Sequence, residues 1–241
     1  MDQNDKAYYL KDLELALLLS LKGMKELYGF RMKHIQDPKP ELIYQTIFEL
    51  KKENLLYVQK SQSHEKEQFA INPELDQILD NIKNAEKILL YFNRQSEHPD
   101  RCIYLGDKAV LISAYGISGN MNRIESVSVS ELPETIYEYG FCIEELLNDK
   151  SIYKEEGIPH PTMREKADAL FDKDFDTLDE KEWGSITDCL KLISVKSRKC
   201  IKQYLLIKDG LNDYFSVTDK EGSHIYIYSR KKVMDTLNSD I

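Results

Sequence analysis

Cysteine, glycine and proline are all scarce in this sequence. Its 241 residues include 4 cysteines, 10 glycines and 7 prolines, and the cysteines lie far apart with no C-x-x-C pair. The chain is therefore neither a disulfide-rich scaffold nor a collagen-like or low-complexity protein. Long apolar runs are missing too: the longest, residues 15–21, is interrupted by Ser20, whereas a membrane-spanning helix needs about 20 apolar residues. With no signal-peptide pattern at its start, we expect reduced thiols in a cytosolic protein.

Basic residues are fewer than acidic ones: 33 Lys and Arg stand against 42 Asp and Glu, which gives a formal net charge of −9. The acidic excess is concentrated in residues 96–150, and no long segment is basic. Binding to nucleic acid depends on neutralising phosphates with Lys and Arg, so this composition disfavours it. What the chain does have is apolar residues, 41% of the total, which is enough to bury a core and excludes a mostly disordered chain.

The first 95 residues predict three helices followed by a two-stranded ribbon, which is the outline of a winged helix. Apolar spacing predicts one helix after Asp12 and another from Pro40, because proline suits the first turn of a helix. Two short apolar segments flank a polar run at residues 59–68 and predict the ribbon. Asn72 and the proline after it then begin a long amphipathic helix.

From residue 102 onward the pattern changes to short stretches of alternating apolar residues. Three antiparallel strands are expected between residues 102 and 130, and Ser130 is expected to begin a helix that reaches Leu147. After a polar segment with two prolines, the second half repeats this order. We expect the following elements there: a helix opened by a capping box at Thr162–Glu165, a helix containing Ile186, Leu190 and Ile193, strands at about 203–208, 212–218 and 224–229, and a helix after Ser229.

The two halves predict an α+β fold with a pseudo-two-fold repeat. Each copy consists of helices, a three-stranded antiparallel meander and a further helix, and a second copy can cover the bare edge that a single meander leaves. We place the N-terminal lobe at residues 1–150, with winged-helix-like helices in 1–95 and a meander and helix in 96–150. The C-terminal lobe spans residues 151–241, and the two lobes form one integrated domain.

Several segments resemble the EspG family, the chaperones of type VII (ESX) secretion, in order and spacing. The chain opens with an apolar helix of the ELALLLSL kind, and its second helix runs into ELKKENLLY. An NPELDQIL helix start and a CIYLGDKAVLISA meander follow, and the second half has a basic run, KSRKCIKQY, before a D-x-x-G hairpin from Asp219 to Gly222. The resemblance covers nearly all of the chain. Its composition, heavy in Lys, Ile, Asn and Tyr rather than Ala and Arg, points to a distant Firmicute-type member.

The resemblance implies a cytosolic chaperone or adaptor that binds a helical secreted protein of the WXG/LXG or PE/PPE kind. Covering an exposed apolar tip of that protein would remove the surface that drives its aggregation. Insertion into a membrane is not expected, and nucleic acid is not the expected partner.

No motif for catalysis or metal binding stands out. The acidic run Asp172–Asp176 has the alternating oxygens of a calcium loop, but Thr177 and Trp183 occupy the positions that need glycine and glutamate. The 5 histidines form no i, i+4 pair. No phosphate-binding loop, dinucleotide fingerprint or nucleophile elbow is present. We therefore expect a protein that is not an enzyme and that uses no cofactor, metal or small-molecule substrate.

The residues expected to bind a partner are tyrosines and loop residues of the two meanders. Alternation within the second meander places aliphatic side chains on one face and tyrosines on the other, and tyrosine is common at protein interfaces. The other interpretation is that helices of the other lobe cover these tyrosines. The loop of the first meander is a second candidate, because exposed apolar loop residues are common in binding proteins. The candidates are Tyr204, Tyr214, Tyr226 and Tyr228 in the second meander and Tyr115, Ile117 and Met121 in the first.

The rival hypothesis is a winged-helix transcriptional regulator that binds DNA. Recognition helices usually present Arg, Lys, Asn or Gln to the groove. The corresponding helix here offers Gln45 and three acids, Glu41, Glu49 and Glu53, against two lysines, Lys51 and Lys52. This charge balance favours a protein partner over DNA.

Overall fold

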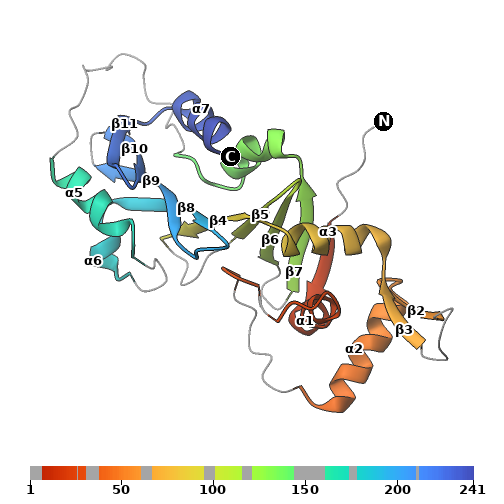
Figure 1. Ribbon diagram of the computed structural model, residues 1–241. Coiled ribbons are helices and arrows are strands. Elements are labelled where there is room, and N and C mark those ends of the chain that lie inside the picture. Colours follow the sequence, from red (N-terminus) through yellow and green to blue (C-terminus); the bar gives the residue numbers. More distant parts are fainter. Residues whose placement is uncertain are drawn as a thin grey trace. The chain divides into compact units, whose positions relative to one another are not determined.

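The computed structural model describes most of the chain as two compact units of helices and antiparallel strands (Figure 1). Unit 1 comprises Met1–Glu86 and Arg101–Val127, and unit 2 comprises Lys87–Asp100 and Ser128–Ile241. The residues that the structure describes are 7–25, 27–30, 38–60, 67–94, 101–115, 121–143, 161–173, 178–209 and 212–241.

Unit 1 contains antiparallel strands in the order β1-β7-β6-β5. They are β1 (Tyr8–Lys11), β5 (Arg101–Leu105), β6 (Ala109–Tyr115) and β7 (Met121–Val127). The meander expected after residue 102 is thus confirmed. The sequence does not predict β1, because this strand has only 4 residues and runs directly into a helix.

The helices of unit 1 begin where their local sequence predicts. α1 (Asp12–Leu21) ends just before Gly23, whose φ of +75° is one that glycine adopts without strain. α2 (Pro40–Lys52) and α3 (Pro73–Lys83) both start with a proline. The Asn72 side chain caps α3 by accepting hydrogen bonds from N–H groups of its first turn.

The ribbon of unit 1 follows α2 and consists of β2 (Leu56–Lys60) and β3 (Glu67–Ile71), as expected. In the described part of the chain two helices, not three, precede it, so the winged-helix outline is not confirmed. Lys22 ties the end of α1 to α3, because its Nζ lies 2.8 Å from carboxylate oxygens of both Asp76 and Asp80. The helical part of the core is made of the buried residues Leu15, Leu18, Leu19, Leu50, Leu75 and Leu79.

Unit 2 is built on an antiparallel sheet in the order β4-β8-β9-β10-β11. Its strands are β4 (Lys87–Asn93), β8 (Ile186–Ser194), β9 (Cys200–Asp209), β10 (Asn212–Asp219) and β11 (Gly222–Ile227), of which the last three are the expected second meander. Its helical elements are η1 (Val129–Glu131), α4 (Leu132–Glu138), α5 (Pro161–Leu170), α6 (Glu180–Trp183) and α7 (Arg230–Asp240). α7 begins as expected after Ser229, whose side chain accepts a hydrogen bond from the N–H of Lys232. The α+β class is confirmed.

Two strands of unit 2 differ from the prediction: β8 was predicted as a helix, and β4 was not predicted. The segment with Ile186, Leu190 and Ile193, predicted as a helix, is the strand β8. Residues 188–193 are all buried, including the polar Asp188 and Lys191, so apolar side chains lie on both faces of the sheet and their spacing also fits a helix. β4 is not predicted for the same reason, since residues 88–92 are buried without interruption.

The helix expected after Ser130 is shorter than predicted. α4 ends at Glu138, and Gly140 follows with a φ of +110°, which stops the helix. Ile143 is buried outside the helix, and the residues expected to continue it lie outside the described part of the chain. The division into lobes at residue 150 and the pseudo-two-fold repeat stay predictions.

Candidate partner-binding surface

Tyr204, one of the tyrosines expected to bind a partner, lies in the core of unit 2. Its ring stacks on that of Phe215, with the ring centroids 6.4 Å apart and the planes 5° from parallel, and the residue is fully buried. The Tyr204 hydroxyl donates a hydrogen bond to Oδ2 of Asp240 at 3.0 Å. Burial, followed by the nearby Asp240 carboxylate, raises the pKa of the Tyr204 hydroxyl far above its ordinary value. The expectation of an exposed Tyr204 was wrong, because this tyrosine completes an aromatic core.

The neighbouring strands β10 and β11 do not present the single tyrosine face that alternation predicts. In their antiparallel register Phe215 lies opposite Tyr226, and Tyr214 lies opposite Ile227. Opposite residues share a face, so Tyr226 is on the Phe215 face and Tyr214 is on the other, where it is buried. The common face expected for Tyr214 and Tyr226 was wrong, because alternation within each strand does not show which residues of two strands lie on the same side.

Tyr226 and Tyr228 are half-buried at the end of β11 and just after it. The Lys232 ammonium lies 4.0 Å from the centroid of the Tyr226 ring, which is a cation–π contact. The Tyr228 hydroxyl accepts a hydrogen bond from the N–H of Ile143 at 3.1 Å and donates one to the Tyr137 hydroxyl at 3.4 Å. Partial burial, followed by the hydrogen bond to Tyr137, raises the pKa of Tyr228 well above its ordinary value. Both tyrosines are thus held in place and still reach solvent.

The surface around these tyrosines joins β11 to α4 and α7. Ile227, between the two tyrosines in sequence but on the opposite face of β11 from Tyr226, is 47% exposed. The Arg230 guanidinium lies 4.7 Å from the centroid of the Tyr137 ring and forms an ion pair with Glu134 of α4. β11 is the last strand in the sheet order of the described residues, so its outer edge carries no further strand there. The name β11–α7 surface is used for Tyr137, Tyr226, Ile227, Tyr228, Arg230 and Lys232.

The candidates of the first meander belong to unit 1. Met121 begins β7, is half-buried, and lies opposite Lys11 of β1 and Tyr115 of β6. The side chain of Tyr115 and the whole of Ile117 lie outside the described residues. A role of these three residues in binding stays a prediction.

Two strongly exposed aromatic side chains on α2 are not found by the sequence reasoning. Tyr44 is 73% exposed and Phe48 is 69% exposed. Both lie outside the inward stripe of the helix, on which Thr46 and Leu50 are buried. A pair of aromatic residues spaced i, i+4 and out of phase with the buried stripe is the signal that reveals them.

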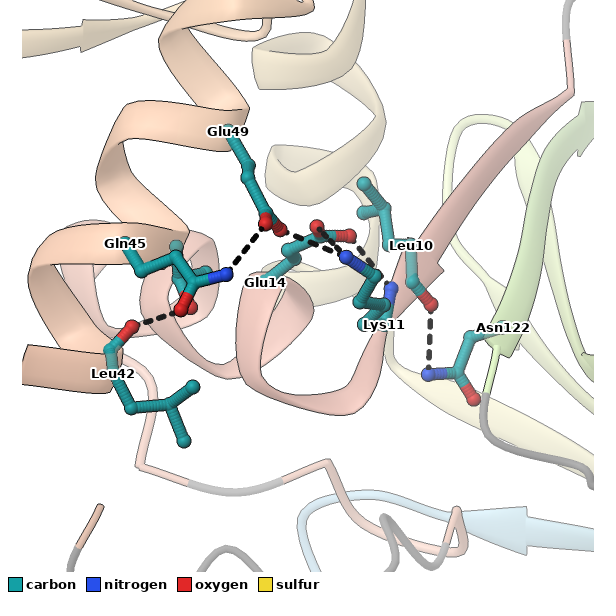
Figure 2. Close-up of polar contacts among 8 residues, drawn as sticks. Leu10, Lys11, Glu14, Leu42, Gln45, Glu49 and Asn122 are labelled. Carbon is teal, nitrogen blue, oxygen red and sulfur yellow. Dashed lines mark hydrogen bonds and ion pairs between the residues drawn. The ribbon is translucent and has the colours of Figure 1, made fainter. Parts of the chain in front are cut away.

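Glu49, on a polar side of α2, forms an ion pair with Lys11, the residue just before α1 (Figure 2). Lys11 Nζ lies 2.7 Å from Oε2 of Glu49 and 3.5 Å from Oε1 of Glu14, and Gln45 donates a hydrogen bond to Glu49 at 3.0 Å. The hydrogen bond between Lys11 and Glu49 lowers the pKa of Glu49 and raises the pKa of Lys11. Polar side chains that a recognition helix would offer to DNA are therefore used within the protein, which does not favour DNA binding.

Buried polar groups of unit 2 support the fold. Ser223 Oγ donates a hydrogen bond to Oδ1 of Asp168 at 2.6 Å, which ties β11 to α5. The buried Lys191 donates to the main-chain carbonyl of Phe171 at 3.1 Å, just after α5. Within the described ranges, no three His, Cys, Asp or Glu side chains come together as a metal site. The last three residues of the acidic run considered as a calcium loop, 174–176, and Thr177 after them lie outside those ranges.

Comparison with known proteins finds a likeness in fold and none in sequence. No family model and no curated protein matches the chain. The structure is similar to that of the Mycobacterium tuberculosis type VII secretion system chaperone EspG5 in complex with a PE25–PPE41 dimer, with a TM-score of 0.54 and 9% identity over 96% of this chain and 94% of that chain. The chain therefore has an EspG5-like fold along nearly its whole length. None of the helices in the described residues has the length and apolar character needed to cross a membrane.

Proposed function

We propose that the chain is a chaperone or adaptor, distantly related to the EspG family, that binds a helical secreted protein through the β11–α7 surface. The exposure of Ile227 at the end of an edge strand, with the half-buried Tyr226 before it on the opposite face and the half-buried Tyr228 after it, carries this proposal. The EspG5-like fold supports it, because EspG5 was solved in complex with a PE25–PPE41 dimer. The partner of this chain would be a WXG/LXG- or PE/PPE-like protein, kept soluble until its export.

The β11–α7 surface has the physical properties of a preorganised binding site. Ile227 and Tyr226 lie on opposite faces of the edge strand β11, so a partner that covers this edge can bury apolar surface on both of its sides, at about 25 cal/mol per Å² buried before the costs of association. Tyrosine adds contact area with few rotatable bonds, and its hydroxyl tolerates water at the rim. The hydrogen bonds of Tyr228 to Ile143 and Tyr137 already fix its ring, so little side-chain entropy is lost on binding.

The charge of this surface indicates the character of the partner. The first turn of α7 carries Arg230, Lys231 and Lys232 and no acidic residue. Arg230 is paired with Glu134, so Lys231 and Lys232 add to the positive end of the helix dipole and give a positive potential that acidic groups would complement. We therefore expect acidic residues beside the apolar tip of the partner.

In this proposal the protein is not an enzyme, uses no cofactor, and acts in the cytosol before its partner is exported. DNA binding has less support, because the net charge is −9 and the polar side of α2 is engaged with Lys11.

Co-expression of the chain with small helical secretion substrates, followed by affinity purification, tests the proposal. We expect one such protein to co-purify in a stable complex and to lose solubility when expressed alone. The proposal fails if no helical protein co-purifies while duplex DNA binds with an affinity that falls steeply with salt, since that result supports the regulator.

A further inference from the structure

The outward side of α2 carries one continuous exposed stripe. At 3.6 residues per turn, four exposed residues of this helix fall within an arc of about 80°. They are Glu41, Tyr44, Phe48 and Lys51. The buried residues Thr46 and Leu50 lie on the other side of the helix, so the stripe is not part of the core of unit 1.

The order of charges along this stripe is simple. Glu41 lies in the first turn of α2 and Lys51 in the last, and the two aromatic side chains lie between them. Neither Glu41 nor Lys51 forms an ion pair with another described residue. Glu49, on a different side of the helix, is the acid that binds Lys11. The stripe is therefore acidic at one end, aromatic in the middle and basic at the other.

Such a stripe is complementary to itself. In an antiparallel pair of identical helices, residues i and j lie side by side when i + j is constant. Tyr44 beside Phe48 gives a sum of 92, and Glu41 beside Lys51 gives the same sum. One register therefore satisfies both the aromatic contacts and the two ion pairs. We propose that α2 binds α2 of a second copy of this chain, across a two-fold axis at the level of residue 46.

The second copy fits this stripe better than an unrelated helix, because both charges and both aromatic positions recur in it by symmetry. α2 has 13 residues and is about 20 Å long, so one helix from each copy makes a contact below the size of standard stable interfaces. We therefore expect a reversible dimer with a dissociation constant in the micromolar range. This inference does not rest on the proposed function, since it concerns residues of unit 1 and not the β11–α7 surface.

Sedimentation velocity on the full chain, over a concentration range from about 1 to 200 μM, tests the contact. We expect the sedimentation coefficient to rise from the monomer to the dimer value, and Phe48→Glu to keep the chain monomeric throughout. Leu42→Glu is the matched control, because Leu42 is also exposed on α2 but lies off the stripe. It should leave the dissociation constant within about twofold of the wild type.

Charge reversal tests the register itself. Glu41→Lys alone and Lys51→Glu alone each place like charges together, so each variant should dimerise at least tenfold more weakly than the wild type. Mixing the two variants restores both ion pairs in a heterodimer and should restore the wild-type dissociation constant. Circular dichroism identical to the wild type confirms that each variant is folded. A wild-type chain that is monomeric at all concentrations overturns the proposal, as does a mixture no tighter than its two components.

Discussion

Tyr204 of β9 and Asp240 at the end of α7 are joined by a hydrogen bond of 3.0 Å between a phenolic hydroxyl and a carboxylate. Lys202, two residues earlier on the same strand, forms an ion pair with the same carboxylate. Asp240 thus fastens the last turn of α7 to the sheet. Its two partners lie on one face of β9, because alternate residues of a strand point the same way.

Asp240→Ala should lower the free energy of unfolding by about 1–3 kcal/mol, because the buried Tyr204 hydroxyl loses its acceptor. Urea denaturation followed by circular dichroism measures the change. Asp235→Ala is the matched control, since Asp235 is an exposed residue of the same helix, and it should change stability by less than about 0.5 kcal/mol. Equal effects of the two substitutions would show that Asp240 does not fasten α7.

Ile227→Asp should abolish capture of the helical partner in co-purification without unfolding the chain. The substitution puts a charge in place of the most exposed apolar side chain of β11, where it would be desolvated in a complex. Ile201→Asp is the control, because Ile201 is also an exposed isoleucine on a strand of unit 2, at 37% exposure, and lies outside that surface. Retained capture by the Ile227 variant would rule out this surface as the binding site.

Tyr228→Phe should lower the free energy of unfolding by about 1 kcal/mol, because the main-chain N–H of Ile143 loses the hydroxyl that accepts its hydrogen bond. Tyr226→Phe is the matched control. It removes the hydroxyl of Tyr226 but keeps the ring that contacts the Lys232 ammonium, so the free energy of unfolding of this variant should match that of the wild type. Thermal unfolding of the two variants in parallel measures the difference. If both lose the same stability, the Tyr228 hydroxyl has no special role.

The contact between Glu49 and Lys11 should make stability depend on pH. The folded-state pKa of Glu49 is lowered, so its stabilising contribution is present above the unfolded pKa of about 4.3 and is lost as the pH falls through the lower folded value. Glu49→Gln should therefore be less stable than the wild type at neutral pH and equal to it in strong acid. Urea titrations across this pH range measure the gap, which should narrow in high salt. A gap that is the same at both pH values would contradict the ion pair.

Features set by a few neighbouring residues could be predicted from the sequence. Asn72 and Ser229 cap the helices that they were expected to cap, and Pro40 begins α2. Each of these features depends on a hydrogen-bond donor or on a fixed φ angle within the first turn of the helix. The resemblance to the EspG family also predicts a fold that agrees with the likeness to EspG5.

Features set by contacts between distant residues could not be predicted. Whether the segment of β8 forms a helix or a strand depends on what packs against it, and here its side chains are buried on both faces of the sheet. Whether a tyrosine is exposed depends on what packs over it: Tyr204 contacts Phe215 and Asp240 and is buried, while Tyr226 contacts Lys232 in the first turn of α7 and stays half-exposed. Alternation shows which side chains of one strand share a face, and the structure is needed to show which face is covered.

The turn between β10 and β11 contains only Lys220 and Glu221, between the paired residues Asp219 and Gly222. A strand that slips by one residue exchanges every side chain between its two faces. Inserting or deleting a single residue in this turn would therefore move Ile227 to the opposite side of the sheet. Related chains can thus acquire a new partner through a change in loop length alone, with every side chain of the strand unaltered.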